Sequence, residues 1–328
     1  MRKNIYKLSV VIVNYRTPQL TIDCLISLIP ELEGVDAKIV VVDNASNDGS
    51  CKKIQNWIDQ ESVSELIDLL SSPDNTGFSG GNNLGIKHVE AEYFLLLNSD
   101  TLVRKNAIAT LLGVADKDES AGLISPRLEW PDTTPQESCF KFHTAMSELI
   151  SSASTGAITK LLQSFVVAQT IRNEKNYYDW ASFACILIKA EVFHDIGLLD
   201  DGYFMYYEDV DFCFRAKKKG WKILNTPSAK VVHLRGGSSP VKSQAKLRKR
   251  LPRYYYESRT RCFYRLYGFL GLLTANILWT FGWFVSSFRG LLSSSYCPNV
   301  SQFQWCDIWT NFFSPERAFI HPDNYDKT

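Results

Sequence analysis

Residues 93–100 read YFLLLNSD, an apolar run that ends at three polar residues. Residues 8–14, LSVVIVN, and residues 39–44, IVVVDN, repeat this pattern, and a weaker apolar run covers residues 66–70. Helical patterns separate the runs. Continuous apolar strands that alternate with helices are typical of a parallel sheet covered on both faces. Because ligands of such sheets bind at the carboxyl ends of the strands, the polar residues there are the first candidates for a binding site.

The second half of the chain has a weaker pattern. Residues 131–176 show little periodicity and are expected to be irregular with some helix. A buried strand is expected over residues 180–188, and a helix over residues 208–219 that is closed by Gly220. A last short strand is expected at residues 231–232.

Composition bounds the class of protein. The 328 residues are 45% hydrophobic and 22% charged, which suits one large α/β domain with an appendage, or two small domains. The net charge of +1 gives no bias toward nucleic acid. Eight cysteines without a CxxC pair predict neither a disulfide framework nor a zinc site. No apolar signal segment with a cleavage site follows Met1, so the catalytic part is expected in the cytoplasm.

Two polar loops are candidates for binding a nucleotide. The carboxylate of Asp43 can accept a hydrogen bond from the imide N–H of uracil or thymine, although residues 43–50, DNASNDGS, also suit a turn and a helix cap. The glycine-rich residues 75–83, NTGFSGGNN, precede a helix and let the backbone approach a phosphate or a sugar. The alternative is a plain capped loop. The GxxxxGK[ST] pattern is missing, so a P-loop ATPase is not predicted.

Three further features carry acid–base or metal chemistry. Asp100 ends an apolar strand and can ligate a divalent cation, or it can cap a helix that follows Thr101. Residues 208–211, EDVD, open a helix, where acids often complement the helix dipole, yet one of them can act as a general base. His233 ends a strand just before residues 235–238, RGGS, which is the setting of a ligand, although a lone histidine is more often structural.

Together these residues resemble the family 2 glycosyltransferases, and within them the bacterial rhamnosyltransferases that build cell-surface polysaccharides. The likeness covers about Leu8 to Ser239 and rests on the order and spacing of its pieces, which are residues 11–15, 42–46, 75–83, 97–101, 126–128, 131–132, 136, 180–182, 206–211, 215, 220–221 and 232–233. In one departure, Phe183 stands where the look-alikes usually have glycine, which bears on the acceptor pocket.

The resemblance implies an α/β fold of the GT-A type, a Rossmann-like nucleotide-binding sheet merged with an acceptor-binding half, over residues 1–240. It also implies roles for single residues. Asp43 would read the base, and Asp100, the last residue of a DxD-type motif, would bind Mg²⁺ or Mn²⁺ together with His233, which could instead contact the diphosphate. Asp209 would be the general base. Further nucleotide-sugar contacts are expected from Asn14, Asn75, Gly80, Asn83 and Ser99, and acceptor-side contacts from Trp180, Glu208 and Asp211.

The implied activity is an inverting, metal-dependent transfer of a sugar, L-rhamnose from dTDP-rhamnose, to a saccharide or a polyprenyl-diphosphate-linked acceptor. Another hexosyl or galactofuranosyl transferase using a UDP-sugar is an alternative. A catalytically weak sugar-nucleotide-binding assembly subunit would be expected to lose Asp100 or Asp209. A nucleotidyltransferase needs a glycine-rich N-terminal loop with basic residues for a triphosphate, which residues 11–16 do not supply. The metal-type Asp100 argues against a glycosidase.

The C-terminal region, residues 241–328, is expected to be helical and membrane-associated. Residues 242–265 contain many basic side chains and a single acidic one, Glu257. This excess of positive charge indicates attraction to anionic lipid or to a lipid diphosphate. Residues 266–288 carry no charge and are long enough to span a bilayer. Trp279 and Trp283 lie in the middle of this segment, which favours a helix or a helical hairpin in the interface, on the cytoplasmic face of the plasma membrane, over a true span. The alternative is a soluble helical subdomain.

Overall fold

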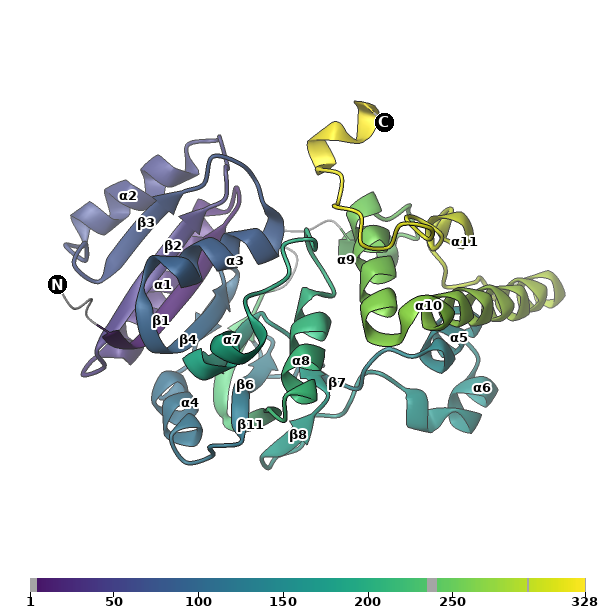
Figure 1. Ribbon diagram of the computed structural model, residues 1–328, viewed down its shortest axis with the longest axis horizontal. Helices are drawn as coiled ribbons and strands as arrows, with labels where there is room; N and C mark the ends of the chain where they lie inside the picture. Colours follow the sequence, from purple (N-terminus) through teal and green to yellow (C-terminus); the bar gives the residue numbers. More distant parts are fainter. Residues whose placement is uncertain (1–4, 235–240, 294, 328) are drawn as a thin grey trace. The chain divides into compact units, whose positions relative to one another are not determined.

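A computed structural model describes residues 5–234, 241–293 and 295–327 (Figure 1). The motif at residues 235–238 lies outside this part. The chain divides into two compact units: unit 1 comprises Met1–Phe140, Thr170–Asp201 and Phe212–Ser238, and unit 2 comprises Lys141–Gln169, Gly202–Asp211 and Ser239–Thr328. The C-terminal region expected after residue 240 therefore folds together with two earlier segments of the chain.

Unit 1 is built on a mixed sheet with the strand order β3-β2-β1-β4-β10-β6-β11-β5, and β8 pairs with β11. Its strands are β1 (Ile5–Asn14), β2 (Ala37–Asp43), β3 (Ile67–Ser71), β4 (Glu90–Asn98), β5 (Thr101–Val103), β6 (Ala121–Glu129), β8 (Asn176–Tyr178), β10 (Cys185–Lys189) and β11 (Lys222–His233). The first four strands are parallel, as predicted, and lie side by side in Figure 1. The continuous apolar sequence of β1, β2 and β4 matches their burial on both faces, because Val10, Val41 and Leu95 on one face and Val11, Val40 and Leu96 on the other are all 0% exposed.

Helices cover this sheet and connect its strands. Those of unit 1 are α1 (Pro18–Leu28), η1 (Ile29–Leu32), α2 (Ser50–Gln60), α3 (Gly77–His88), α4 (Ala107–Ala115) and α7 (Ala190–Ile196), while α8 (Glu208–Lys218) begins in unit 2. The packing of α3 explains two of the glycines in the sequence motif. A Cβ atom on Gly81 would lie 2.9 Å from Val13 Cγ1, and one on Gly85 would lie 2.4 Å from Val11 Cγ1. These glycines therefore let α3 lie directly on β1.

Two strands differ from the sequence-based expectation. The last strand, β11, extends over Lys222–His233, because it continues past a register shift around Pro227, which cannot donate a ladder hydrogen bond. The strand expected over residues 180–188 is two strands. The first is β9 (Trp180–Ala181), which pairs with β7 (Cys139–Phe140) in a small second sheet, and the other is β10 of the main sheet.

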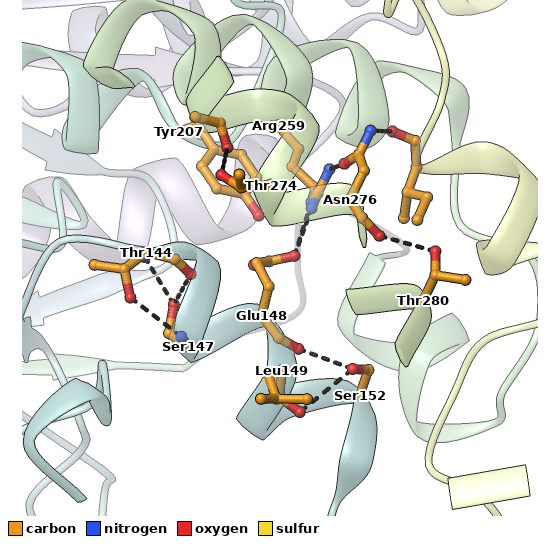
Figure 2. Close-up of polar contacts among 12 residues, drawn as sticks. Thr144, Ser147, Glu148, Leu149, Ser152, Tyr207, Arg259, Thr274, Asn276 and Thr280 are labelled. Carbon is orange, nitrogen blue, oxygen red and sulfur yellow. Dashed lines mark hydrogen bonds and ion pairs between the residues drawn. The ribbon is translucent and has the colours of Figure 1, made fainter. Parts of the chain in front are cut away.

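Unit 2 is helical within the described residues. It contains α5 (Ala145–Ala153), α6 (Gly156–Leu161), η2 (Gln163–Phe165), α9 (Val241–Lys246), α10 (Arg253–Leu292), α11 (Gln304–Asp307) and η3 (Pro322–Lys327). A capping box between Thr144 and Ser147 starts α5 (Figure 2). Helix α10 packs closely on α5, because a Cβ atom on Gly282 would lie 2.2 Å from Ser152 Oγ. At Gly268, with φ 69°, the backbone of α10 breaks into two helical stretches.

The second stretch of α10, after Gly268, contains most of the predicted uncharged segment and has two different faces. One face packs inside unit 2, with Leu272 and Asn276 0% exposed and Trp279 2% exposed. The other face carries exposed apolar side chains at helical spacing, namely Leu270, Ile277, Phe281, Phe284, Phe288 and Leu291. By length and composition, α10 is a helix that could cross a membrane.

The basic block of the sequence divides into two parts. Its C-terminal members form ion pairs within unit 2, which are Arg250–Asp307, Arg253–Glu257, Arg259–Glu148 and Arg265–Asp211. Lys242, Lys246, Arg248 and Lys249 are exposed. Only this exposed part is therefore suited to bind an anionic partner at long range.

Candidate functional site

The carboxyl ends of β1 and β2 hold a fixed carboxylate. Asn14 and Asp43 are register partners on these parallel strands. The Asn14 Nδ2 group donates to Asp43 Oδ1 (2.6 Å), and the Ser46 hydroxyl donates to the same oxygen (2.6 Å). Asp43 Oδ2 accepts a longer bond from the Ser46 backbone N–H (3.3 Å). Since a carboxylate has about four acceptor positions, Asp43 keeps the capacity to accept an N–H from a ligand.

The N-cap residue of α2 is Gly49, with φ 88°, and no side chain among the described residues caps the helix from that position. Helix α2 begins at Ser50, and the backbone N–H of Ser50 donates to Asp48 Oδ1 (2.9 Å). Interaction with the side chain of Ser50, and then with its backbone N–H, lowers the pKa of Asp48. Ala45 and Asn47 adopt φ angles of 57° and 52°, which are uncommon outside glycine and recur at functional sites. Asp43 is therefore not the cap of α2.

The glycine-rich loop is tied to the end of β2 by two asparagines. Asn44 Nδ2 donates to Asn75 Oδ1 (2.9 Å) and to the carbonyl oxygen of Gly77 (2.9 Å), while the backbone N–H of Thr76 donates to Asn44 Oδ1 (3.2 Å). Asn44 was not selected from the sequence as a site residue. The signal that could have identified it is its position directly after Asp43, at the end of a buried strand.

Two residues that were expected to contact the nucleotide sugar also have contacts within the fold. Asn83 Nδ2 donates to the carbonyl oxygen of Leu199 (2.8 Å), and the Leu199 N–H donates to Asn83 Oδ1 (3.1 Å), so the backbone of Leu199 engages both ends of the amide. A Cβ atom on Gly80 would lie 2.4 Å from Thr76 Cβ, so local packing already accounts for glycine there. These contacts give Asn83 and Gly80 a role in the fold, and their predicted contact with the donor stays a prediction.

Asp100 and His233 come together at the ends of β4 and β11. Because β11 pairs with β5, His233 lies opposite Thr101, and its Nε2 atom is 3.4 Å from Asp100 Oδ1. Gln136 Nε2 donates to the carbonyl oxygen of His233 (2.7 Å). A strand, not a helix, follows Asp100, so Asp100 does not cap a helix at this point.

The pair fits a divalent cation. Within the described residues, the buried Nδ1 atom of His233 has no hydrogen-bond partner, and no group of three or more His, Cys, Asp or Glu side chains is available to hold a metal. An oxygen ligand from Asp100 and a nitrogen ligand from His233 would leave the other positions to diphosphate and water. Mg²⁺ in particular is commonly bound by few protein ligands together with substrate phosphates and water.

A chain of hydrogen bonds connects the two parts of this site in unit 1. The Asn14 Oδ1 atom accepts from the backbone N–H of Thr17 (3.3 Å), and the Thr17 hydroxyl lies 3.3 Å from the Ser99 hydroxyl. Ser99 directly precedes Asp100. The expected residues Asn14, Asp43, Ser99, Asp100 and His233 therefore gather at one edge of the sheet.

The acidic residues in the first turn of α8 belong to unit 2. Burial and the neighbouring Asp209 carboxylate raise the pKa of Glu208 well above its usual range. Its Oε2 atom has no hydrogen-bond partner among the described residues. Asp209 Oδ1 accepts a bond from the N–H of Val210 (2.9 Å), and Asp211, 1% exposed, pairs with Arg265 (2.9 Å). The neutral form of Glu208 is thus favoured beside Asp209.

Glu208→Gln is expected to change the pH dependence of stability. The raised pKa means that the folded state holds a proton that the unfolded chain releases above a pKa of about 4.3, so the wild type loses stability as the pH rises above that value. Glutamine removes this loss. The free energy of unfolding of the variant relative to wild type should therefore rise between pH 4 and pH 7, by up to about 1.4 kcal/mol per pH unit.

Thermal unfolding of Glu208→Gln at several pH values measures this effect. Glu191→Gln is the control, because Glu191 also lies in a first helical turn but is exposed. A Glu208→Gln curve parallel to that of the wild type would show that Glu208 ionises normally in the folded protein.

Two aromatic residues of the expected acceptor side are packed within unit 1. Trp180 stacks on Phe140, with ring centroids 4.1 Å apart. Phe183, the departure from the look-alike pattern, is 2% exposed and packs edge-on against Phe212. Phe183 is therefore a core residue of unit 1.

Comparison with curated proteins gives relatives of modest identity. The chain is 27% identical over 230 residues to the low-salt glycan biosynthesis hexosyltransferase Agl10 of Haloferax volcanii, covering 69% of this chain and 66% of the relative. It is 25% identical to an N-acetylglucosaminyl-diphospho-decaprenol L-rhamnosyltransferase of Mycobacterium tuberculosis, covering 61% and 67%. It is 26% identical to the dTDP-rhamnosyl transferase RfbF of Shigella flexneri, covering 73% and 72%. The chain thus spans about two thirds of the length of these relatives.

Solved structures confirm the expected fold class. GalNAc-T7 with UDP, GalNAc and Mn²⁺ matches with a TM-score of 0.58 and 16% identity, covering 95% of this chain and 55% of that one. The mannosyltransferase PcManGT of Pyrobaculum calidifontis with GDP-Man and Mn²⁺ matches with a TM-score of 0.53 and 14% identity, covering 95% and 86%. The fold is therefore of the GT-A type. A family model described as glycosyl transferase family 2 matches residues 9–180, more than half of the chain, which therefore belongs to that family.

Proposed function

We propose that the chain is an inverting, metal-dependent glycosyltransferase that moves L-rhamnose from dTDP-rhamnose to a saccharide or polyprenyl-diphosphate-linked acceptor in glycan synthesis. The observation that carries the proposal is the pairing of Asp100 with His233 at 3.4 Å, at the sheet edge that also holds Asp43. Asp43 would bind the base, and Asp100 with His233 would bind the metal ion at the diphosphate, so this edge of the sheet suits a nucleotide diphosphate. The names of the relatives support rhamnose as the sugar and a diphospho-polyprenol as the acceptor.

The donor is bound by residues of unit 1 in this proposal. Asp43, oriented by Asn14 and Ser46, accepts the imide N–H of the base. Asp100 and His233 would hold Mg²⁺ or Mn²⁺, which when bound offsets the negative charge of the leaving nucleotide diphosphate. Asn75 acts through the loop that it fixes with Asn44.

The acceptor is activated by Asp209 in this proposal. The carboxylate takes the proton of the acceptor hydroxyl as that oxygen attacks the anomeric carbon, and the bond to the diphosphate oxygen breaks on the opposite face. The configuration therefore inverts, and no covalent sugar–enzyme intermediate forms. Glu208, held neutral by its raised pKa, keeps a second negative charge away from the reacting centre.

The product that is released tests this proposal against its rivals. Incubation with dTDP-rhamnose and an acceptor should release nucleoside diphosphate in step with acceptor glycosylation. Release of pyrophosphate would identify a nucleotidyltransferase, and binding without turnover would identify an assembly subunit. Faster transfer from a UDP-hexose or UDP-galactofuranose than from dTDP-rhamnose would overturn the donor assignment and favour a hexosyltransferase, as Agl10 is named.

We also propose that the exposed apolar face of α10 lies in the membrane interface on the cytoplasmic side. The opposite face is packed inside unit 2, so a single amphipathic surface suits in-plane binding better than a span. Deletion of the residues after Arg265 would remove buried core residues such as Leu272 and Trp279. Surface substitutions therefore test the idea more cleanly than truncation.

Replacing Phe281, Phe284 and Phe288 with serine should weaken binding to anionic vesicles by about 10- to 100-fold per phenylalanine, because each inserted ring contributes about 1.5–3 kcal/mol. Neutralising Lys246, Arg248 and Lys249 should weaken it mainly at low salt, since salt screens their attraction. Vesicle co-sedimentation measures both effects, and Ile26→Ser, at an exposed apolar position of α1, is the control. A wild-type protein that never sediments with vesicles would indicate a soluble subdomain and a soluble acceptor.

A further inference from the structure

The segment that carries Asp209 has an uncommon backbone. Tyr206 and Tyr207, which directly precede Glu208, both lie in the left-handed region, with φ angles of 72° and 68°. Bulky residues rarely adopt this conformation, and it persists only where the surrounding structure enforces it. Two such residues in succession therefore need specific contacts to hold them.

Those contacts come from the first stretch of α10. The ring of Tyr255 packs against the rings of Tyr206 and Tyr207, with centroids 5.8 and 5.7 Å away. The hydroxyl groups of Tyr255 and Tyr207 are 3.3 Å apart. One helical turn further, the Ser258 hydroxyl donates to the carbonyl oxygen of Met205 (3.1 Å). The chain before Asp209 is thus held by both side-chain packing and backbone hydrogen bonding.

The chain after Asp209 is held by the same helix. Arg265 Nε donates to Asp211 Oδ1 (2.9 Å), and the Asp211 side chain is 1% exposed. A buried carboxylate paired with a guanidinium defines its geometry more strictly than a solvated one does. Residues 205–207 and 211, on the two sides of Asp209, are therefore fixed to one helix.

That part of α10 is itself anchored in unit 2. Arg259 donates to Glu148 Oε2 of α5 through Nε (3.0 Å) and Nη2 (2.6 Å), and its Nη1 donates to Asn276 Oδ1 (2.7 Å). Figure 2 shows Glu148 and Asn276 both pointing toward Arg259. Asn276 lies beyond the break at Gly268, so this buried network connects the two stretches of α10 with each other and with α5.

We infer that Tyr255, Ser258 and Arg265, here called the α10 clamp, are positioning residues that hold Asp209 in its reactive geometry. The inference rests on the proposed role of Asp209 as general base. Because misplacement of a reacting group by about 1 Å can cost about 10²-fold in rate, contacts that fix the backbone on both sides of a base control turnover.

Steady-state kinetics of Arg265→Gln test the inference. The expected result is a kcat for transfer lowered by about 10- to 100-fold, with the KM for the donor unchanged and the fold retained by circular dichroism. Arg265→Lys, which keeps the charge, should recover a large part of kcat. Arg253→Gln is the matched control, because Arg253 forms an ion pair of the same length with the buried Glu257 on the same helix, and its kcat should stay within about twofold of wild type.

The double variant Asp209→Asn/Arg265→Gln separates positioning from a purely structural role. If Arg265 acts through Asp209, the double variant should be no slower than Asp209→Asn alone, because residues that act as a unit are not additive. Losses that multiply would overturn the positioning role. A folded Arg265→Gln protein with the kcat of Arg253→Gln would also overturn it.

The two proposals fail in different ways. Full turnover in Asp209→Asn would remove the base assignment, whereas an inactive Asp209→Asn together with normal kcat in a folded Arg265→Gln would remove only the clamp. If Arg265→Gln does not fold, Ser258→Ala decides, because it deletes one hydrogen bond to Met205 and keeps the ion pair. A kcat lowered severalfold at unchanged donor KM supports the clamp, and a normal kcat overturns it.

Discussion

Asp209→Asn is expected to lower the turnover number for glycosyl transfer by about 10²-fold or more, while the affinity for the donor and for the metal stays near the wild-type value. Asparagine has almost the same shape as aspartate but cannot take a proton. The backbone on both sides of residue 209 is held by the clamp residues of α10, so the substitution should leave the fold intact. Rapid-quench transfer assays and donor-binding calorimetry measure the two quantities separately.

Glu191→Gln is the control for this experiment, because it neutralises an exposed acid in the first turn of another helix. The neighbouring Glu208 cannot easily substitute for Asp209, since burial raises its pKa and favours the protonated form. An Asp209→Asn enzyme with near-normal turnover would therefore show that the base is another group.

Removal of divalent metal is the second change with a large expected effect. Excess chelator should abolish transfer, and Mg²⁺ or Mn²⁺ should restore it, because the leaving diphosphate needs charge stabilisation in the transition state. Asp100→Ala and His233→Ala should each weaken metal-dependent donor binding by about 10²-fold, while metal-free donor binding changes little. Calorimetric titration of the donor with and without Mn²⁺ distinguishes these two quantities.

The matched control is His88→Ala. His88 also pairs with a carboxylate of unit 1, Asp68, at 2.9 Å, but it lies on the last turn of α3 and is more exposed than His233. Loss of metal-dependent binding in His88→Ala as well would indicate a general effect on unit 1. Full activity in excess chelator would contradict the assignment of both Asp100 and His233.

The parallel half of the fold could be predicted from the sequence because β1, β2 and β4 are buried on both faces and are therefore continuous apolar runs. The long strand β11 could not, since Asn225 to Ser228, NTPS, has the composition of a turn. The strand continues through these residues because it pairs with β6 on both sides of Pro227. Similarly, β9 and β10 form one apolar stretch in the sequence and separate only because they pair with different strands.

The candidate site was predictable where strand ends determine it. Asn14, Asp43 and Asp100 follow apolar runs, so their approach could be inferred from sheet geometry alone. The hydrogen bonds of Asn83 and Asn44 could not be inferred in this way, because they depend on partners far along the chain, such as Leu199 for Asn83. The basic block shows the same limit, since Arg259 and Arg265 find their carboxylates at Glu148 and Asp211. The number of basic residues in a stretch of sequence does not show which of them form buried ion pairs and which lie on a lipid-binding surface.

The most direct test of the proposed activity is product NMR after incubation of the full chain with dTDP-rhamnose, Mg²⁺ and a diphospho-polyprenol saccharide acceptor. We predict a new rhamnosyl linkage whose anomeric configuration is opposite to that of the donor, formed in equal amount with the nucleoside diphosphate. A product that retains the configuration of the donor, or donor hydrolysis without a glycosylated acceptor under these conditions, would contradict the account.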